Sequence, residues 1–145
     1  LAEGGPDYAV PFCNEREIPL TDSASRALNA RIRRVSDRPR NPTNRAEGQA
    51  LKYLQSGHAA LKSGHSVEPA GFQTGEVYTA YVPIMTNAMC LQCHGTAGEE
   101  LAPTTQERIL EAYPDDEAVG YSANELRGAW VVELSTTEAI ILPNQ

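Results

Sequence analysis

Polar and apolar residues alternate, or β-forming residues gather, in three short stretches of the chain. Residues 31–36 run Arg-Ile-Arg-Arg-Val-Ser, residues 75–84 are rich in Val, Tyr and Thr, and residues 128–135 contain Trp130 beside two valines. Such patterns are typical of half-buried strands. We therefore expect three β-strands at these positions.

Helical periodicity occupies much of the remaining chain. Residues 45–62 place apolar side chains on one side of an amphipathic helix. Residues 8–28 are compatible with a helix that Pro11 and Pro19 interrupt. A short helix is expected after Asn87, a good N-cap, and another from Thr104 to about residue 113.

The order of these elements lacks the regular alternation of strands and long helices that marks a doubly wound fold. We expect an α+β fold, in which helices flank a small antiparallel sheet. A single domain should span residues 1–145, with residues 1–7 and 136–145 at its periphery.

The net charge of the chain bears on which classes of partner it can bind. Nineteen acidic against twelve basic residues give a net charge of −7, which argues against nucleic acid and anionic membranes. No apolar run approaches the roughly 20 residues of a membrane helix, so no membrane insertion is expected. The sequence begins at Leu1 without a visible secretory signal, and we expect a processed form.

The apolar core is thin for a chain of this length. Leu, Ile, Val and Phe contribute 28 of 145 residues, close to the boundary of about 20 % below which chains tend to be disordered. Patterned segments, six Tyr and one Trp argue for a folded domain. A large flat cofactor would supply the missing apolar surface.

The motif that carries chemistry is Cys90-Leu91-Gln92-Cys93-His94. Cys-x-x-Cys-His is the attachment signature of c-type haem. On one helical turn Cys90, Cys93 and His94 share a face, so that two thiols can form thioethers with the haem vinyl groups while His94 binds iron. The motif predicts one covalently attached haem c. Bacteria attach this group outside the cytoplasm, so we expect a periplasmic or lumenal protein.

Two other chemistries use paired cysteines. A thioredoxin-type redox pair usually opens a helix within a βαβ unit, which the pattern does not show. A zinc site needs a second pair of ligands, and only Cys13, His58 and His65 remain, widely scattered. The histidine directly after the second cysteine favours haem.

The spacing of the residues alone does not identify the second axial ligand of the iron. The candidates are Cys13, His58, His65, Met85 and Met89. Methionine is the usual partner in cytochromes c, and Met85 is better placed than Met89, which adjoins the attachment turn. Cys13 could equally be a small buried apolar residue, and both histidines could be exposed to solvent.

Four stretches together resemble a known family, over about residues 8–135. They are Phe12-Cys13-Asn14, then Arg33–Ser36 with Arg40–Asn44, then Val82–Ile84 leading to Cys90–Gly95, and finally Ala118–Tyr121 leading to Gly128–Trp130. The family is that of the PAS-like haem c domains, which occur as sensor domains of bacterial signalling proteins and as free-standing soluble proteins. The chain departs from its pattern at Asp37-Arg38-Pro39.

The resemblance implies a PAS-like fold in which the haem lies against an antiparallel sheet. It also implies His/Cys axial ligation, with His94 as the proximal ligand and Cys13 as the distal thiolate. A thiolate stabilises ferric iron, and we expect a low reduction potential. Loss of Cys13 on reduction would open the iron to carbon monoxide or nitric oxide.

Charged residues gather in two segments. Seven of the twelve basic residues lie within residues 26–45; Arg34 and Arg40 are the candidates for pairing with haem propionates, the alternative being a solvated strand face. Residues 99–138 hold ten acids and two bases. This acidic face could dock a redox partner protein, or simply keep the protein soluble. The sequence sets no oligomeric state.

Three functions are consistent with these features. A soluble monohaem cytochrome for electron transfer comes first, because no output domain accompanies the haem motif. A redox or diatomic-gas sensor is the alternative, although fold alone is weak support for function. A haem enzyme such as a peroxidase comes last, because no distal acid–base histidine is evident; we expect no enzymatic activity.

Overall fold

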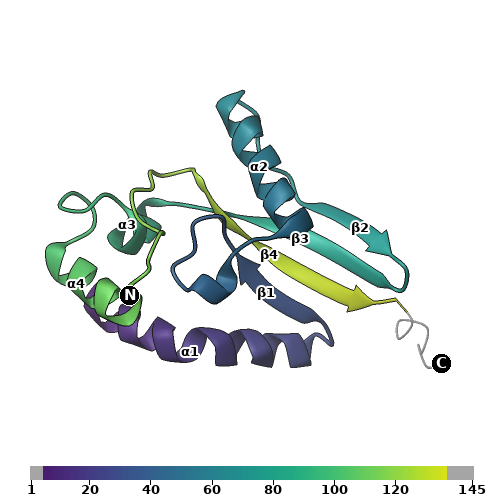
Figure 1. Ribbon diagram of the computed structural model, residues 1–145, viewed down its shortest axis with the longest axis horizontal. Helices are drawn as coiled ribbons and strands as arrows, with labels where there is room; N and C mark the ends of the chain where they lie inside the picture. Colours follow the sequence, from purple (N-terminus) through teal and green to yellow (C-terminus); the bar gives the residue numbers. More distant parts are fainter. Residues whose placement is uncertain (1–4, 137–145) are drawn as a thin grey trace.

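The computed structural model describes residues 5–136, apart from the side chains at positions 7, 8, 12–14 and 16–18. Of the predicted periphery, residues 1–7 and 136–145, residues 1–4 and 137–145 lie outside the described residues, whereas residues 5–7 begin the first helix. The elements are α1 (Gly5–Ala27), β1 (Arg31–Val35), a 3-10 turn (Pro42–Asn44), α2 (Gly48–Lys62), β2 (Ala70–Thr74), β3 (Val77–Met85), α3 (Ala88–His94), α4 (Pro103–Ala112) and β4 (Leu126–Ser135) (Figure 1).

The four strands form one antiparallel sheet in the order β1-β4-β3-β2. The first strand of the chain therefore lies beside the last, and Trp130 of β4 is paired with Arg34 on one side and Val82 on the other. The expected α+β architecture, an antiparallel sheet flanked by helices, is confirmed. So are the three predicted strands, within a few residues at their ends.

The strand β2 was not predicted. Its five residues, Ala-Gly-Phe-Gln-Thr, are all exposed, so they show neither alternation nor a run of β-branched residues. The strand forms because a two-residue turn, with Gly75 at φ +58°, folds it back onto β3. Its extended conformation is thus set by pairing rather than by its own composition.

The main core lies between α2 and one face of the sheet. Leu54 and Ala50 of α2 pack against Tyr81 of β3 and Val131 of β4, all of them buried. Tyr53 of α2 also stacks on Tyr81, with ring centroids 5.2 Å apart. The amphipathic pattern over residues 45–62 therefore predicted both the helix and its buried face.

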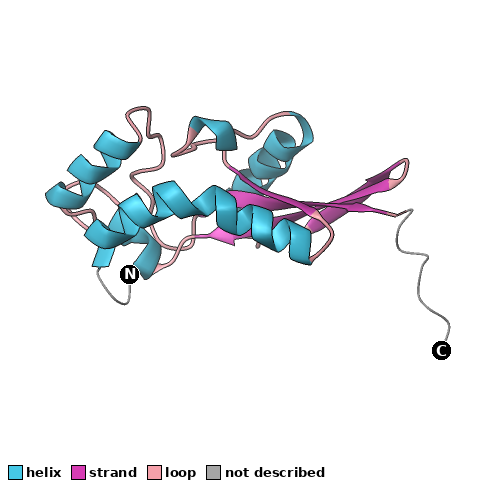
Figure 2. Ribbon diagram, turned by 90° about the horizontal axis from the view of Figure 1, so that it is seen from below, coloured by secondary structure: helices cyan, strands magenta, loops and turns pink. Residues whose placement is uncertain are grey.

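Helix α1 lies against the opposite side of the sheet. It contacts β1 and α4, and in the view from below it runs across the sheet toward the end that carries the shorter helices (Figure 2). Val10 packs there with Leu101 and Ile109 in a second, smaller core. None of the described helices is long and apolar enough to span a membrane.

The expected interruption of α1 by proline does not occur. The helix is continuous through Pro11 and Pro19, although each ring removes a backbone hydrogen bond. Both prolines are exposed, so water can reach the carbonyl groups that the missing N–H groups leave without a partner. Packing on α4 and β1 maintains the helix where local propensity alone would break it.

Gly128 marks the closest approach of β4 to the end of β1, and it supports a first prediction. A Cβ there would collide with the backbone carbonyl oxygen of Val35, which cannot swing away. Gly128→Ala should destabilise the fold by about 1–3 kcal/mol in urea unfolding. Gly71→Ala is the control, because the atoms nearest to its Cβ belong to the flexible and exposed side chain of Tyr78. Equal stability of the two variants would contradict the prediction.

Candidate functional site

Helix α3 presents the Cys-x-x-Cys-His motif, as the sequence predicted. Asn87 caps it, since its side-chain oxygen accepts hydrogen bonds from the backbone N–H groups of Met89 at 2.9 Å and Cys90 at 3.2 Å. The helix ends at Gly95, whose N–H donates to Leu91 O. A Cβ at position 95 would lie only 2.6 Å from that same oxygen, so the tight exit from the helix requires glycine.

The two thiols lie one turn apart on this helix. Cys90 and Cys93 are both half-buried, and Cys93 packs against the small core that contains Val10 of α1 and Leu101. Within the described part of the chain, no three His, Cys, Asp or Glu side chains gather in a way that would hold a metal ion. The arrangement thus offers two neighbouring thiols on α3, of which Cys93 packs against the cluster that contains Val10 of α1.

His94 has a defined tautomer. Its Nδ1 lies 2.7 Å from the carbonyl oxygen of Ala118, and because a carbonyl only accepts, Nδ1 must carry the hydrogen. Burial and, to a smaller extent, the nearby positive charges of Arg40 and Arg127 together lower the pKa of His94 to about 3. The ring is neutral at physiological pH, and its Nε2 lone pair is the one that can bind a metal.

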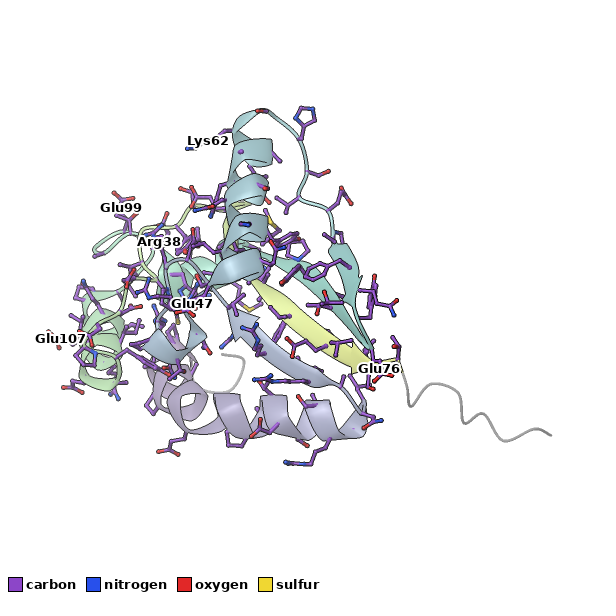
Figure 3. The ribbon with its side chains drawn as sticks, turned by 45° about the vertical axis from the view of Figure 1, so that its right-hand side comes forward. Arg38, Glu47, Lys62, Glu76, Glu99 and Glu107 are labelled. Atoms are coloured by element: carbon purple, nitrogen blue, oxygen red, sulfur yellow. The ribbon has the colours of Figure 1, made fainter. Side chains whose placement is uncertain are left out.

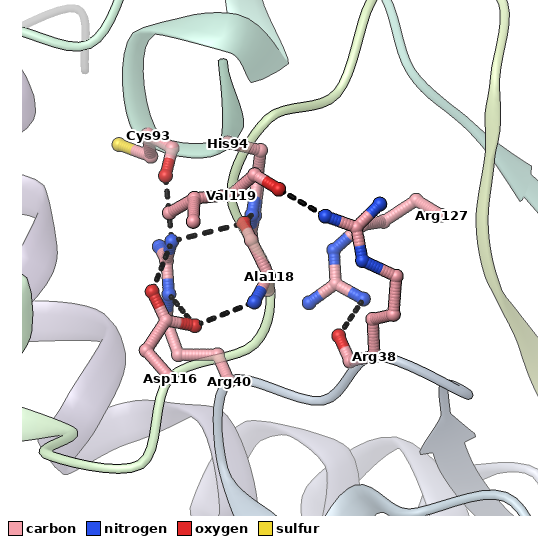
Figure 4. Close-up of polar contacts among 8 residues, drawn as sticks. All are labelled: Arg38, Arg40, Cys93, His94, Asp116, Ala118, Val119 and Arg127. Carbon is pink, nitrogen blue, oxygen red and sulfur yellow. Dashed lines mark hydrogen bonds and ion pairs between the residues drawn. The ribbon is translucent and has the colours of Figure 1, made fainter. Parts of the chain in front are cut away.

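A buried ion pair lies directly behind this histidine (Figure 4). Nε and Nη2 of Arg40 donate to the two carboxylate oxygens of Asp116, each at 3.2 Å. Nη2 of Arg40 also donates to Cys93 O at 2.6 Å and to Ala118 O at 3.3 Å. The Asp116 carboxylate in turn accepts the N–H of Ala118 at 2.9 Å.

The segment after α4 is held against α3 by its backbone as well. Gly120 N–H donates to Gly95 O, and Tyr121 N–H donates to His94 O, both at 2.9 Å. The Tyr121 ring meets the His94 ring edge-on, with centroids 6.2 Å apart. Residues 118–121 therefore form the surface that contacts the imidazole ring of His94.

Two further arginines stack on Tyr121. The guanidinium carbon of Arg38 lies 4.4 Å from its ring centroid and that of Arg127 lies 5.4 Å away. Arg127 is anchored by Ser36, to whose hydroxyl its Nη1 donates at 2.6 Å. Burial lowers the pKa of Arg127, although the group stays charged. Arg127 was not among the predicted site residues, because it belongs to no sequence motif.

An open pocket of about 430 Å³ lies between α1 and the sheet. Its walls are apolar except for one threonine, which makes it suitable for an apolar group. From α1 come Leu20, Thr21 and Ala24, and from the sheet come Ile32, Val82, Trp130 and Val132.

The predicted propionate partners have different surroundings. Arg34 is exposed and lies with its guanidinium carbon 5.6 Å from the Trp130 ring centroid, beside the pocket. Arg40 is only 14 % exposed and its Nε and Nη2 are engaged by Asp116 and two carbonyl groups. This geometry favours a positioning role for Arg40 over a contact with a propionate.

The candidates for a second axial ligand are dispersed. The side chain of Cys13 lies outside the described residues, although its backbone belongs to α1. Met85 packs against the α2 side of the sheet, and Met89 is 54 % exposed. His58 Nε2 lies 2.9 Å from Asp37 Oδ2, and His65 is exposed in the turn after α2.

Comparison with known proteins agrees with this small mixed fold of helices around an antiparallel sheet. The model of the Tll0287-like family matches residues 14–135. The chain belongs to this family.

One solved structure that resembles the chain is the crystal structure of the cyanobacterial heme-protein Tll0287. The two are 23 % identical, with a TM-score of 0.65 over 81 % of this chain and 68 % of the other. At this identity the likeness shows the fold alone. No curated protein sequence matches the chain.

Proposed function

We propose that this chain is a monohaem c-type domain, with the haem attached through Cys90 and Cys93 and its iron bound by His94. The observation that carries the proposal is the α3 turn itself. Two half-buried thiols precede a neutral histidine whose Nδ1–H is fixed by Ala118 O. Membership of the Tll0287-like family supports it, because Tll0287 is described as a heme-protein.

The chain's own residues fit such a group. The pocket between α1 and the sheet has apolar walls, as the faces of a porphyrin require. When bound, a haem supplies a one-electron couple between ferric and ferrous iron. The protein's contribution is to hold the imidazole in one tautomer, cover the ring faces and keep bulk water away.

Cys13 is the distal ligand in this proposal. Position 13 precedes Leu20 by seven residues and Ala24 by eleven, so these three positions lie about two and three helical turns apart on one face of α1. Leu20 and Ala24 both line the pocket. Val10, one turn before position 13, packs in the same cluster as Cys93. The helix thus runs from the attachment turn to the pocket, with position 13 between them.

Arg34 is the propionate partner in this proposal. It lies on the pocket face of β1, beside Trp130, and it is exposed. A propionate at the rim of the pocket would be within the range of a long, flexible arginine, and the guanidinium group suits a carboxylate. We further infer that the sheet is PAS-like, since its first strand lies between α1 and its last strand.

Electron transfer at low potential is the activity that we propose. A thiolate ligand favours ferric iron, and the apolar pocket is better suited to electron exchange than to the acid–base chemistry of a peroxidase.

An exposed acidic surface adjoins α3 and would dock a basic redox partner outside the cytoplasm. Figure 3 shows Glu99 and Glu107 of this surface pointing outward. Three further exposed acids of this surface are Glu100, Glu111 and Asp115.

Gas sensing is the alternative, and one experiment separates the two. The full chain is produced with the haem maturation machinery, reduced, and exposed to carbon monoxide and nitric oxide. Reversible reduction and oxidation without gas binding is expected for electron transfer. A ferrous form that binds either gas, and changes conformation on doing so, would replace electron transfer by sensing. Haem that acid acetone extracts from the wild-type chain would overturn covalent attachment itself.

A further inference from the structure

The buried Arg40–Asp116 pair is a polar cluster close to His94, and Asp116 belongs to none of the stretches that carry the family resemblance. The Asp116 side chain is 2 % exposed and that of Arg40 is 14 % exposed. Burying two charges is costly unless they meet in good geometry and their remaining hydrogen-bonding groups are satisfied. Here the guanidinium group of Arg40 donates hydrogen bonds to both carboxylate oxygens of Asp116 and to two backbone carbonyl groups.

Those two carbonyl groups belong to the two sides of the site. Cys93 O comes from the last turn of α3, and Ala118 O comes from the segment that follows α4. Ala118 O is also the acceptor of His94 Nδ1–H. One guanidinium group therefore joins the helix that carries the histidine to the carbonyl that orients it.

Asp116 holds the same residue, Ala118, through its backbone N–H group. Its carboxylate accepts Ala118 N–H at 2.9 Å, which fixes the conformation of residues 116–118. Because the His94 ring makes no other hydrogen bond with the described residues, the direction of the Ala118 carbonyl sets the direction of the ring. An oriented acceptor behind a ligating histidine also adjusts how strongly that histidine donates to a metal.

We propose that Arg40 and Asp116 are positioning residues, which lock His94 to the attachment helix through Ala118 and whose opposite charges balance the field at the iron. The inference rests on the proposed function. Loss of Asp116 would leave a positive charge behind His94 and favour the ferrous state. Loss of Arg40 would leave a buried negative charge and favour the ferric state. Simple loosening of the fold would not produce shifts of opposite sign.

The test is the midpoint potential and the ferric electron paramagnetic resonance spectrum of Asp116→Asn and Arg40→Gln in the full, haem-loaded chain. Asp116→Asn should raise the potential and Arg40→Gln should lower it, each changing the reduction equilibrium constant roughly tenfold. Both should broaden or shift the low-spin signal, because His94 loses its fixed orientation. Arg40→Lys keeps the positive charge but loses the paired N–H donors of the guanidinium group. It should therefore alter the low-spin signal while shifting the midpoint potential less than Arg40→Gln does.

The neighbouring pair Arg45–Glu117 supplies matched controls. It bridges the same two segments of the chain but is exposed, at 45 % and 46 %. Arg45→Gln and Glu117→Gln should leave both readouts unchanged. If Asp116→Asn does not fold, the two Arg40 variants decide. The inference alone would be overturned if the midpoint potential shifted in the same direction in Asp116→Asn and in Arg40→Gln. Shifts no greater than those of the controls would also overturn it. Absence of covalent haem from the wild type would overturn the proposed function and the inference together.

Discussion

Replacing Cys90 and Cys93 together by alanine is expected to abolish covalent attachment of haem completely. The thiols lie one turn apart on α3 and are the only cysteine side chains that the structure describes, so no other described side chain can form a thioether with haem. Each single variant should keep one thioether, and therefore keep haem on the chain in reduced yield. The measurement is the mass of the denatured chain together with its haem absorbance.

The fold itself should tolerate this double substitution. Both cysteines are only half-buried, and alanine is a good helix former. Alanine at Met89 and Gln92, exposed positions of the same helix, gives the matched control, which should retain haem fully. Haem that remains bound to the denatured double variant would show that another residue forms the link.

Cys13→Ser is expected to produce the second large effect, at the opposite side of the iron. A low-spin ferric spectrum with thiolate features should be lost, and the midpoint potential should rise by roughly 0.1 V, within the range of about 0.8 V that axial ligands span. The physical reason is the loss of a negative ligand that stabilises ferric iron. Visible absorption, electron paramagnetic resonance and a redox titration measure it.

Glu15→Gln tests whether a change in α1 alone has this effect. Glu15 lies on the same helix and is exposed, so its variant should keep the wild-type spectrum. A spectrum that is the same in Cys13→Ser and in the wild type would remove Cys13 from the iron. Met85 or a histidine would then become the candidate ligand, and α1 would be a cover for the pocket without a ligating role.

The sequence predicted elements whose own residues carry the necessary pattern. The helix of residues 45–62 is predicted from an apolar face that the structure buries, and the strand of residues 31–36 from its alternation of apolar and charged residues. The exposed strand β2 has no such face, and only its pairing with β3 makes it a strand. The break expected at Pro11 and Pro19 was wrong because contacts with α4 and β1 outweigh a local preference.

The site shows the same division between local and distant residues. Cys90, Cys93 and His94 are adjacent in sequence, and their spacing predicts one helical turn with an Asn87 cap. Ala118 acts through its backbone carbonyl, a group that every residue has, so the resemblance of residues 118–121 to the family did not indicate this role. Asp116 and Arg127 lie far along the chain from the motif, and the fold alone brings them to it.

The mass of the wild-type chain under denaturing conditions tests the central claim most directly. The chain is produced with haem maturation machinery, unfolded in acid, digested, and analysed peptide by peptide. Our account predicts one haem per chain, retained on the peptide that contains Cys90 and Cys93. A bare peptide, with the haem recovered separately as a free group, would contradict it.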